Sequence, residues 1–307
     1  ANPSLAHVSP QGLVTALAPG VTQIVVSSEG KSATAAVTIV PLDRHPVECT
    51  APKPAWIWCD DFEEDLLQRY SDYQPGRPSF ERMAWAGYGG SVGMRAHFER
   101  DQVNAGALHV RFGRTPGADF RPVDDGRTIH RDVYWRVYVK YAPWWIGGGG
   151  NKMSRAQSLA SRDWAQAMIA HVWVPNRPLD RLWIEPASGV GFRGRLATEY
   201  YNDFRHLEWP GRALSKTPLF APSHLGKWYC IEARARLNDP GRSNGVFELW
   251  IDDRPEARLT GLGWMGSFQE YGINAVYLEN YWNEGAPQPQ DRYFDNFVVS
   301  TERIGCR

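Results

Sequence analysis

The sequence has no net charge and no long apolar run. Its 307 residues include 34 basic and 34 acidic side chains, so there is no general field that would attract nucleic acid or an anionic membrane. Apolar runs are far shorter than the roughly 20 residues that cross a bilayer. No secretory segment stands at the N-terminus, although such a segment can be removed on export. We therefore expect no nucleic-acid partner and no membrane span.

The sequence also lacks cysteines paired as metal ligands. Its four cysteines are Cys49, Cys59, Cys230 and Cys306, and no two form a C-x-x-C pair, which argues against a zinc site. An even number in a tryptophan-rich chain with β periodicity favours two disulfides, an oxidising compartment and a secreted or cell-surface protein. Four buried free thiols in a cytosolic protein are the alternative. The residues alone leave all three pairings open.

Aromatic residues are absent from the first 55 positions. All 14 Trp, 13 Tyr and 12 Phe lie from Trp56 onward, whereas the N-terminal part is rich in Ala, Val, Thr, Ser and Pro. Prolines recur through residues 41–55, which is typical of a stiff, extended linker. The composition therefore predicts a small domain over residues 1–42, a linker over 43–55 and a large domain over 56–307.

Apolar residues recur with a period of two rather than 3.6 in most of the chain. Residues 107–112, for example, place Leu108 and Val110 opposite His109 and Arg111. Similar alternation predicts strands over residues 12–17, 21–27, 32–40, 92–100, 132–141, 228–237, 247–252, 273–283 and 293–300. Helix signals are weak, and residues 154–164 are the best candidate. The pattern predicts an all-β antiparallel sandwich.

Three of these strands have a polar face of His, Arg, Lys and Tyr in place of the usual Ser, Thr and Glu. They are the strands at residues 92–100, 107–112 and 132–141. On a single strand, cations that cover exposed aromatic rings would explain such a face equally well. Because the composition repeats on three strands, we favour a concave sheet that binds a ligand.

A hairpin near the C-terminus carries a distinctive motif. Residues 226–253 read G-K-W-Y-C-I-E-A-R-A-R-L-N-D-P-G-R-S-N-G-V-F-E-L-W-I-D-D, and this run resembles a hairpin of concanavalin A-like jelly rolls of the polysaccharide-lyase type. Residues 60–63 (D-D-F-E), 134–140, 147–153 (G-G-G-G-N-K-M) and 293–301 (Y-F-D-N-F-V-V-S-T) resemble other segments of that fold. The resemblance covers residues 56–305 and implies a concanavalin A-like β-jelly-roll sandwich.

The N-terminal strands show a second resemblance. Residues 6–24 and 36–40 are similar to the C-terminal half of bacterial Ig-like domains of the second type, with the pattern G-L-V-T-A at residues 12–16. Such modules are spacers and adhesion units. This resemblance therefore implies a small Ig-like β segment without chemistry of its own.

The jelly-roll resemblance implies further contacts, because the first and last strands of that fold pair antiparallel. Cys306 would then return towards Cys49, which implies the disulfides Cys49–Cys306 and Cys59–Cys230. Four carboxylates would also meet where many relatives have a structural calcium ion. These are Asp60, Asp61, Glu63 and Asp295. The alternative is that such side chains cap backbone N–H groups.

A four-glycine loop at residues 147–150 precedes two cations, Lys152 and Arg155. Such a loop suits a mobile lid or a backbone that closely approaches a sugar. The G-x-x-x-x-G-K-[ST] spacing of a nucleotide-binding loop is absent. We therefore expect these cations to bind an acidic sugar.

His171 is the candidate catalytic histidine. On a strand it would share a face with Trp173, whereas Gln166 has the opposite parity and could line the same groove only across a β-bulge. Alginate-type lyases of the resembling fold carry a Gln-x-His pair that this chain lacks. A buried core histidine is therefore an open alternative.

Two further runs mix aromatic, amide and acidic side chains. Residues 198–203 include Tyr200 and Asn202, and residues 278–283 place Glu279, Tyr281 and Asn283 on one face. Aromatic rings and amides in a groove suit pyranose rings and their hydroxyls. A strand whose aromatic residues fill the core is the alternative.

These residue types point to β-elimination in a uronate-containing polysaccharide. The reaction needs a group that neutralises the carboxylate, a base for the C5 proton and an acid for the leaving oxygen. The candidates are Arg136, Lys152 and Arg155 for the carboxylate, and His171, Tyr281 and Tyr200 for proton transfer. We expect a secreted monomeric lyase that requires no cofactor and acts on an acidic polysaccharide.

Four other functions are alternatives to the lyase. A non-catalytic carbohydrate-binding or adhesion module fits the Ig-like neighbour, and a structural surface protein would bury all its aromatics. A retaining glycosidase needs two nearby carboxylates, but the E-x-D-x-E patterns of laminarinase-type proteins are absent. A serine esterase is disfavoured because there is no G-x-S-x-G elbow.

Overall fold

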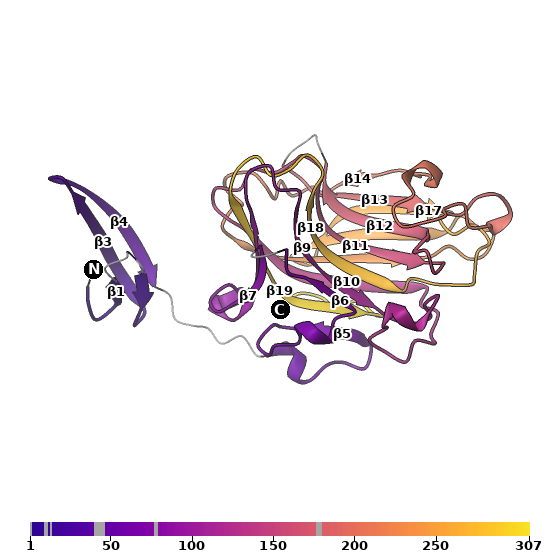
Figure 1. The fold of residues 1–307 in the computed structure, drawn as a ribbon, viewed down its shortest axis with the longest axis horizontal. Helices are drawn as coiled ribbons and strands as arrows, with labels where there is room; N and C mark the ends of the chain where they lie inside the picture. The colour runs from indigo at the N-terminus through magenta and orange to yellow at the C-terminus, as the bar shows by residue number, and fades with distance from the viewer. Residues whose placement is uncertain (1, 9–11, 13, 40–46, 77–78, 176–179) are drawn as a thin grey trace. The chain divides into compact units, whose positions relative to one another are not determined.

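The computed structural model describes all residues except 1, 9–11, 13, 40–46, 77–78 and 176–179 (Figure 1). The chain divides into two units, Ala1–Arg44 and His45–Arg307. Regular structure within the described ranges consists of β-strands and short 3-10 turns, so the predicted all-β class is confirmed. In the same ranges, no helix has the length and apolar character needed to cross a bilayer.

The strands of the first unit are β1 (Ala6–Val8), β2 (Val14–Ala16), β3 (Gly20–Ser28) and β4 (Lys31–Ile39). Those of the second unit are β5 (Trp56–Asp60), β6 (Asp72–Gln74), β7 (Phe80–Met83), β8 (Gly93–Phe98), β9 (Asn104–Arg111), β10 (Asp132–Tyr141), β11 (Asn151–Leu159), β12 (Gln166–Val174), β13 (Trp183–Ser188), β14 (Ala213–Leu214), β15 (Trp228–Arg236), β16 (Gly245–Ile251), β17 (Arg254–Leu262), β18 (Ala275–Trp282) and β19 (Gln290–Ser300). The 3-10 turns are η1 (Glu48–Thr50), η2 (Leu67–Arg69), η3 (Tyr88–Gly90), η4 (Ala118–Phe120), η5 (Phe192–Gly194) and η6 (Phe204–His206).

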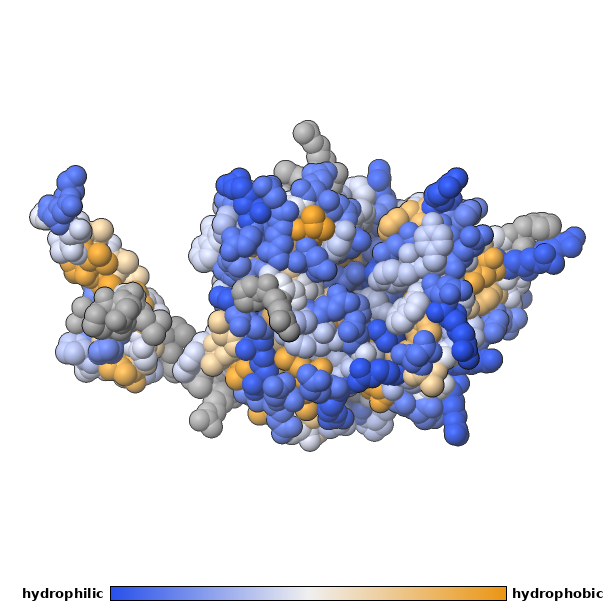
Figure 2. Space-filling view, in the orientation of Figure 1, coloured by the Kyte–Doolittle hydropathy of each residue, from blue (hydrophilic) through white to orange (hydrophobic). Residues whose placement is uncertain are grey.

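The first unit consists of two antiparallel hairpins, β1–β2 and β3–β4. Val21, Val25 and Val26 on β3 are each more than half exposed, and Figure 2 shows apolar residues in orange on the surface of this unit. Two hairpins of this size bury little apolar surface on their own. The pairing does not distinguish an Ig-like segment from other hairpins, so that resemblance stays a prediction.

The second unit is a sandwich of two antiparallel sheets (Figure 1). One sheet has the order β17-β16-β15-β10-β19-β8-β7, with β5 also paired to β19. The other has the order β14-β13-β12-β11-β18-β9-β6. Trp135 and Phe294 of the first sheet belong to the same core cluster as Leu108 and Val172 of the second. The predicted sandwich is therefore confirmed.

The helix predicted over residues 154–164 is wrong, because residues 151–159 form the central strand β11. This strand lies between β12 and β18 and pairs with both. Its small residues face the opposite sheet, where Ser154 Oγ accepts a hydrogen bond of 3.0 Å from Trp135 Nε1. Pairing on both sides outweighs the weak local helix preference.

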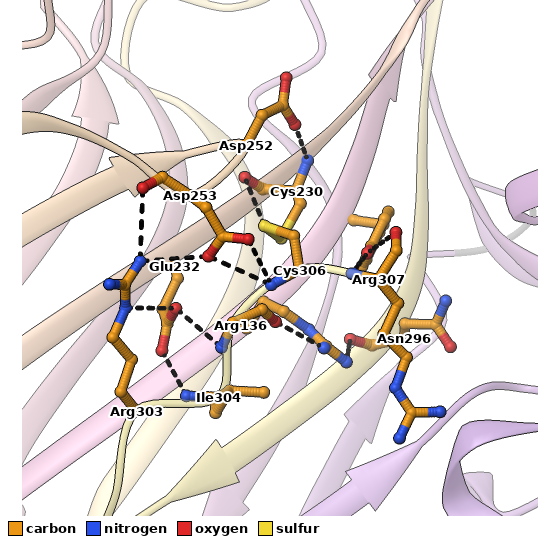
Figure 3. The surroundings of a disulfide bond; sticks show 12 residues. Arg136, Cys230, Glu232, Asp252, Asp253, Asn296, Arg303, Ile304, Cys306 and Arg307 are labelled. Atoms are coloured by element: carbon orange, nitrogen blue, oxygen red, sulfur yellow. Dashed lines mark hydrogen bonds and ion pairs between the residues drawn. A yellow bond between two sulfur atoms is a disulfide. The ribbon is translucent and has the colours of Figure 1, made fainter.

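The first and last strands do pair as predicted, with Cys59 of β5 opposite Val298 of β19. The predicted disulfides are nevertheless wrong, since the bonds are Cys49–Cys59 and Cys230–Cys306. After β19 the chain crosses to β15 (Figure 3), where the Ile304 N–H donates to Glu232 Oε1 at 2.7 Å. The crossing brings Cys306 to Cys230. The two expected disulfides are thus present with a different pairing.

The four carboxylates expected at a calcium site each accept a backbone hydrogen bond. The donors are the N–H groups of Phe62 for Asp60, Cys49 for Asp61, Val92 for Glu63 and Asn296 for Asp295. Within the described ranges, His, Cys, Asp and Glu side chains form no group of three suited to a metal ion. These carboxylates thus make the capping contacts that were the alternative, and the calcium site stays a prediction.

Part of the predicted linker belongs to the sandwich. Residues 43–46 lie outside the described ranges, but Glu48 is only 4% exposed and pairs with the guanidinium of Arg136 on β10. The carbonyl of Ala55 accepts a hydrogen bond of 3.0 Å from the N–H of Thr301. Residues 47–55 are therefore an integral part of the second unit and not a spacer.

Candidate functional site

A cleft of about 970 Å³ lies on the face of the seven-stranded sheet that points away from the core. Because side chains alternate along a strand, the core residues and the cleft residues lie on opposite faces of this sheet. On β9, Leu108 and Val110 belong to the core, whereas His109 and Arg111 line the cleft. The volume is in the range of sites for sugars and other small ligands.

One row of polar side chains crosses the floor of this cleft. The strand registers place His171 opposite Arg155, Arg155 opposite Tyr277, Tyr277 opposite His109, and His109 opposite Asp72. Directly opposed residues of neighbouring strands have their side chains on the same face. Five strands therefore contribute to one continuous polar surface.

A β-bulge at Met153 places two cations of opposite parity in the same cleft. Lys152 and Arg155 are three positions apart and would point to opposite faces of a regular strand. The register of β11 shifts between Lys152 and Ser154, and Met153 and Ser154 both face inward. Lys152 and Arg155 consequently both line the cleft. Sequence periodicity alone could not reveal this shift.

Arg155 is a buried, ion-paired cation. Its Nη2 lies 2.8 Å from Glu279 Oε1, and its side chain is 1% exposed. It also donates to Asn202 Oδ1 at 3.1 Å and to the Tyr201 hydroxyl. Glu279 compensates the charge of Arg155, so this guanidinium organises the floor and is not a free ligand for an anion.

Lys152 is the cation that remains available. Its Nζ lies 4.5 Å from the centroid of the Tyr281 ring and makes no hydrogen bond or ion pair with the described residues. Burial lowers the pKa of this ammonium group. Tyr281 is 37% exposed, so a ligand in the cleft can reach the phenol and the ammonium group together.

His171 is held in its neutral form. Burial first, and the charges of Arg155 and Lys152 second, keep the pKa of His171 well below its usual value. Its ring is nearly parallel to that of Trp209, with 5.8 Å between centroids. His171 therefore lines the cleft as a neutral imidazole and not as a cation.

A second histidine, which sequence reasoning did not select, occupies the other end of the row. His109 Nδ1 lies 3.2 Å from Asp72 Oδ2, and its ring stacks on Tyr277 at 3.6 Å. The hydrogen bond with His109 lowers the pKa of Asp72 to about 2. Tyr277 in turn accepts a hydrogen bond of 3.3 Å from Arg111 Nε. Alternation along β9 pointed to His109 and Arg111, but strand register was needed to find Asp72 and Tyr277.

Seven of the ten sequence-predicted catalytic and binding residues line the cleft. They are Lys152, Arg155, His171, Asn202, Glu279, Tyr281 and Asn283. The expectation that several strands contribute to one site is therefore met for these residues. The remaining three are Gln166, Tyr200 and Arg136.

Gln166 lies beneath the cleft surface. The bulge that this placement would require does exist, because the register of β12 shifts between Gln166 and Met168. Gln166 Oε1 accepts a hydrogen bond of 2.8 Å from the N–H of Asn202, and its Nε2 donates to Gln157 Oε1 at 2.5 Å. Gln166 thus supports Asn202 and is not itself among the residues that line the cleft.

The neighbouring tyrosine takes the place predicted for Tyr200. Tyr200 is 52% exposed and lies outside the cleft lining, whereas Tyr201 lines it. Tyr201 is partly buried and its hydroxyl accepts from Arg155, and this burial raises the pKa of its phenol. Because the chain between β13 and β14 is irregular, strand alternation could not have shown which of the two tyrosines faces the cleft.

Arg136 lies in the other sheet. It is fully buried and contacts Glu48, and it donates to the carbonyl of Gly305 at 3.0 Å (Figure 3). The polar faces of β8 and β10 cover the opposite side of the sandwich, and only that of β9 lines the cleft. The assignment of Arg136 to substrate binding is therefore wrong.

The four-glycine loop packs against the end of β18. A Cβ added to Gly149 would collide with Trp282 Nε1, and one added to Gly150 would lie 2.6 Å from Asn283 Nδ2. Both glycines also have positive φ, which favours glycine. The close approach expected of this loop is thus to the protein's own Trp282 and Asn283.

Comparison with known proteins gives a fold but no family. The sequence matches no protein-family model and no curated protein. Solved structures with a similar fold include alginate lyase vAL-1 from Chlorella virus (TM-score 0.55, 11% identity, 80% of this chain and 100% of that one). They also include endo-β-1,4-glucuronan lyase from the fungus Trichoderma reesei (0.54, 10%, 80% and 96%) and the PL-14 alginate lyase from Aplysia kurodai (0.53, 12%, 80% and 99%). At these identities the likeness establishes that the chain has the β-jelly-roll fold of polysaccharide lyases.

Proposed function

We propose that this protein is a polysaccharide lyase that cleaves a uronate-containing polymer by β-elimination. One observation carries the proposal: Lys152, which lies against the ring of Tyr281, lines the same cleft as His171. The three similar structures named above are lyases of alginate or glucuronan, which are polymers of uronic acids. That likeness supports the reaction class.

The cleft has a group for each part of the reaction. Lys152 neutralises the uronate carboxylate and so makes the C5 proton more acidic. The neutral imidazole of His171 takes this proton, and the electrons of the C5–H bond form the C4=C5 double bond. The C4–O4 bond breaks, and Tyr281 donates its hydroxyl proton to O4. Solvent then takes the proton from His171 and returns one to Tyr281, so the enzyme regains its starting state.

Hydrolysis is less well supported by the same cleft. Its lining carboxylates are Asp72 and Glu279. A glycosidase needs one carboxyl group whose pKa is raised so that it can act as an acid. Asp72 has its pKa lowered to about 2 by His109, and Glu279 is paired with Arg155. Asp72 is therefore unsuited to donate a proton near neutral pH, and the ion pair of Glu279 with Arg155 holds that carboxylate at the floor of the cleft.

The two disulfides support secretion or display on the cell surface, because such bonds persist in oxidising compartments. Binding without catalysis is the second candidate. It is favoured by the exposed aromatic side chains Phe204 and Trp209 at the cleft, which are typical platforms for sugar rings.

The test is a panel of alginate, glucuronan, pectate and glycosaminoglycans. Elimination creates a conjugated C=C–carboxylate that absorbs at about 235 nm, whereas hydrolysis does not. We expect absorbance to rise with at least one polymer and to be lost in Lys152→Ala and His171→Ala. No absorbance change with any polymer, together with measurable binding, would instead favour the carbohydrate-binding module.

A further inference from the structure

A fully buried arginine of the other sheet reaches the underside of the cleft floor. Arg292 lies on β19 and is 0% exposed. Its Nη2 donates to the carbonyl of Lys152 at 3.0 Å and to that of Glu279 at 2.6 Å. Its Nη1 donates to Asn151 Oδ1 at 2.9 Å. One guanidinium thus joins the two strands that carry Lys152 and Glu279.

This cation has no carboxylate partner among the described residues. Aromatic rings surround it, with Phe294 at 5.0 Å and Tyr141 at 5.8 Å from the guanidinium carbon. Removing a cation from water is costly unless its donors are satisfied. The observed acceptors are two backbone carbonyls and the side-chain oxygens of two asparagines. The buried guanidinium is therefore stabilised by hydrogen bonds to the two strands and not by an ion pair.

The main-chain positions that Arg292 binds are those where the strand registers shift. On β11 the shift lies between Lys152 and Ser154, and on β18 it lies between Glu279 and Tyr281. Asn280 extends the contact to β9, because its Oδ1 accepts from Arg292 Nη2 at 2.6 Å and its Nδ2 donates to the carbonyl of Gly106 at 3.2 Å. Arg292 therefore joins β11 and β18 directly and β9 through Asn280, all at their irregular points.

We propose that Arg292 is a positioning residue for the cleft. It fixes the bulge in β11 that turns Lys152 to the same side as Arg155, and it fixes the backbone on both sides of Asn280, from which Glu279 and Tyr281 project. It does not line the cleft and acts only through these strands. The catalytic part of this inference rests on the proposed lyase function, whereas the positional part does not.

The test compares Arg292→Met with Arg136→Met. Arg136 is also fully buried and lies in the same sheet as Arg292. Its side chain contacts Glu48 and Gly305 and not the strands of the cleft, so its replacement controls for general loss of stability. We expect Arg292→Met to lower kcat by about 100-fold at a temperature where both variants are folded, because a displacement of about 1 Å has effects of this size. Arg136→Met should keep wild-type kcat. Equal kcat in the two variants would overturn the proposal.

Two further measurements keep the proposal testable. If Arg292→Met does not fold, Asn280→Ala removes one acceptor while the cation remains, and it should show the same selective loss of kcat. A crystal structure of Arg292→Met, or of Asn280→Ala in its place, should show a changed register at Met153 with Lys152 turned out of the cleft. An unchanged bulge would overturn the positional claim. A wild-type protein without lyase activity would contradict the proposed function alone, because the structure of the variant still tests the positional claim.

Discussion

The Lys152 ammonium lies 4.5 Å from the centroid of the Tyr281 ring, and the two residues are directly opposite each other on β11 and β18. This pair joins the cation that can neutralise a carboxylate to the phenol that can transfer a proton. Lys152 faces the same cleft as Arg155 only because β11 contains the bulge at Met153. Local chain geometry therefore decides whether this site can exist.

Replacement of Tyr281 by Phe removes the hydroxyl and leaves the ring against Lys152. We expect kcat to fall by about 10²–10⁴-fold, the usual contribution of a general acid or base, with little change in thermal stability because Tyr281 is partly exposed. Tyr200→Phe is the matched control, since Tyr200 is an exposed tyrosine outside the cleft. Equal activity of the two variants would exclude Tyr281 as the acid.

Activity should persist below the usual pKa of histidine. Because the pKa of His171 is lowered, the imidazole stays neutral as the pH falls and is protonated only well below 6.5. The acidic limb of the kcat/KM profile should lie in that range, where protonation removes the base. An acidic limb at or above pH 6.5 would rule out His171 in this environment as the base.

Strand alternation and composition predicted a large share of this site. The face shared by Glu279, Tyr281 and Asn283 follows from the period of β18, and the polar face of β9 was evident from His109 and Arg111. Arg136 is a residue for which the same reasoning gave the wrong site. Arg111 and Arg136 have the same local pattern, but their strands belong to different sheets, and only the order of strands in space separates them.

Neither the pairing of the cysteines nor the position of the bulges could be predicted from the sequence, and the two reasons are related. Pairing of β5 with β19 was expected and observed, yet the path of the chain after Ser300 decides which cysteine Cys306 meets. Backbone hydrogen bonds from residues 304–306 to Glu232 and Asp253 determine that path. A bulge likewise depends on contacts with distant residues, such as Arg292.

Replacement of Glu279 by Gln leaves the buried Arg155 without a counter-charge. Loss of one partner of a buried ion pair costs about 3–5 kcal/mol, so we expect a large decrease in the free energy of unfolding by urea titration. Removal of the negative charge should also tighten binding of acidic oligosaccharides at low salt. An unchanged unfolding free energy would show that Arg155 does not need Glu279.

The two disulfides should contribute unequally to stability. Their sequence separations are 76 for Cys230–Cys306 and 10 for Cys49–Cys59. Loop-closure entropy then gives about 4.5 and about 2.7 kcal/mol respectively. We expect the double variant Cys230→Ala/Cys306→Ala to unfold at lower urea concentration than Cys49→Ala/Cys59→Ala. The reverse order would mean that contacts of the N-terminal segment, such as that of Glu48 with Arg136, outweigh chain entropy.

The most direct test of the central claim is the mass of the oligosaccharide products. Elimination adds no water at the cleaved bond, so we predict products whose new non-reducing ends are one water lighter than those of hydrolysis. Products of the full hydrolytic mass, with no double bond at the new non-reducing end, would contradict the account and show that this cleft hydrolyses its substrate.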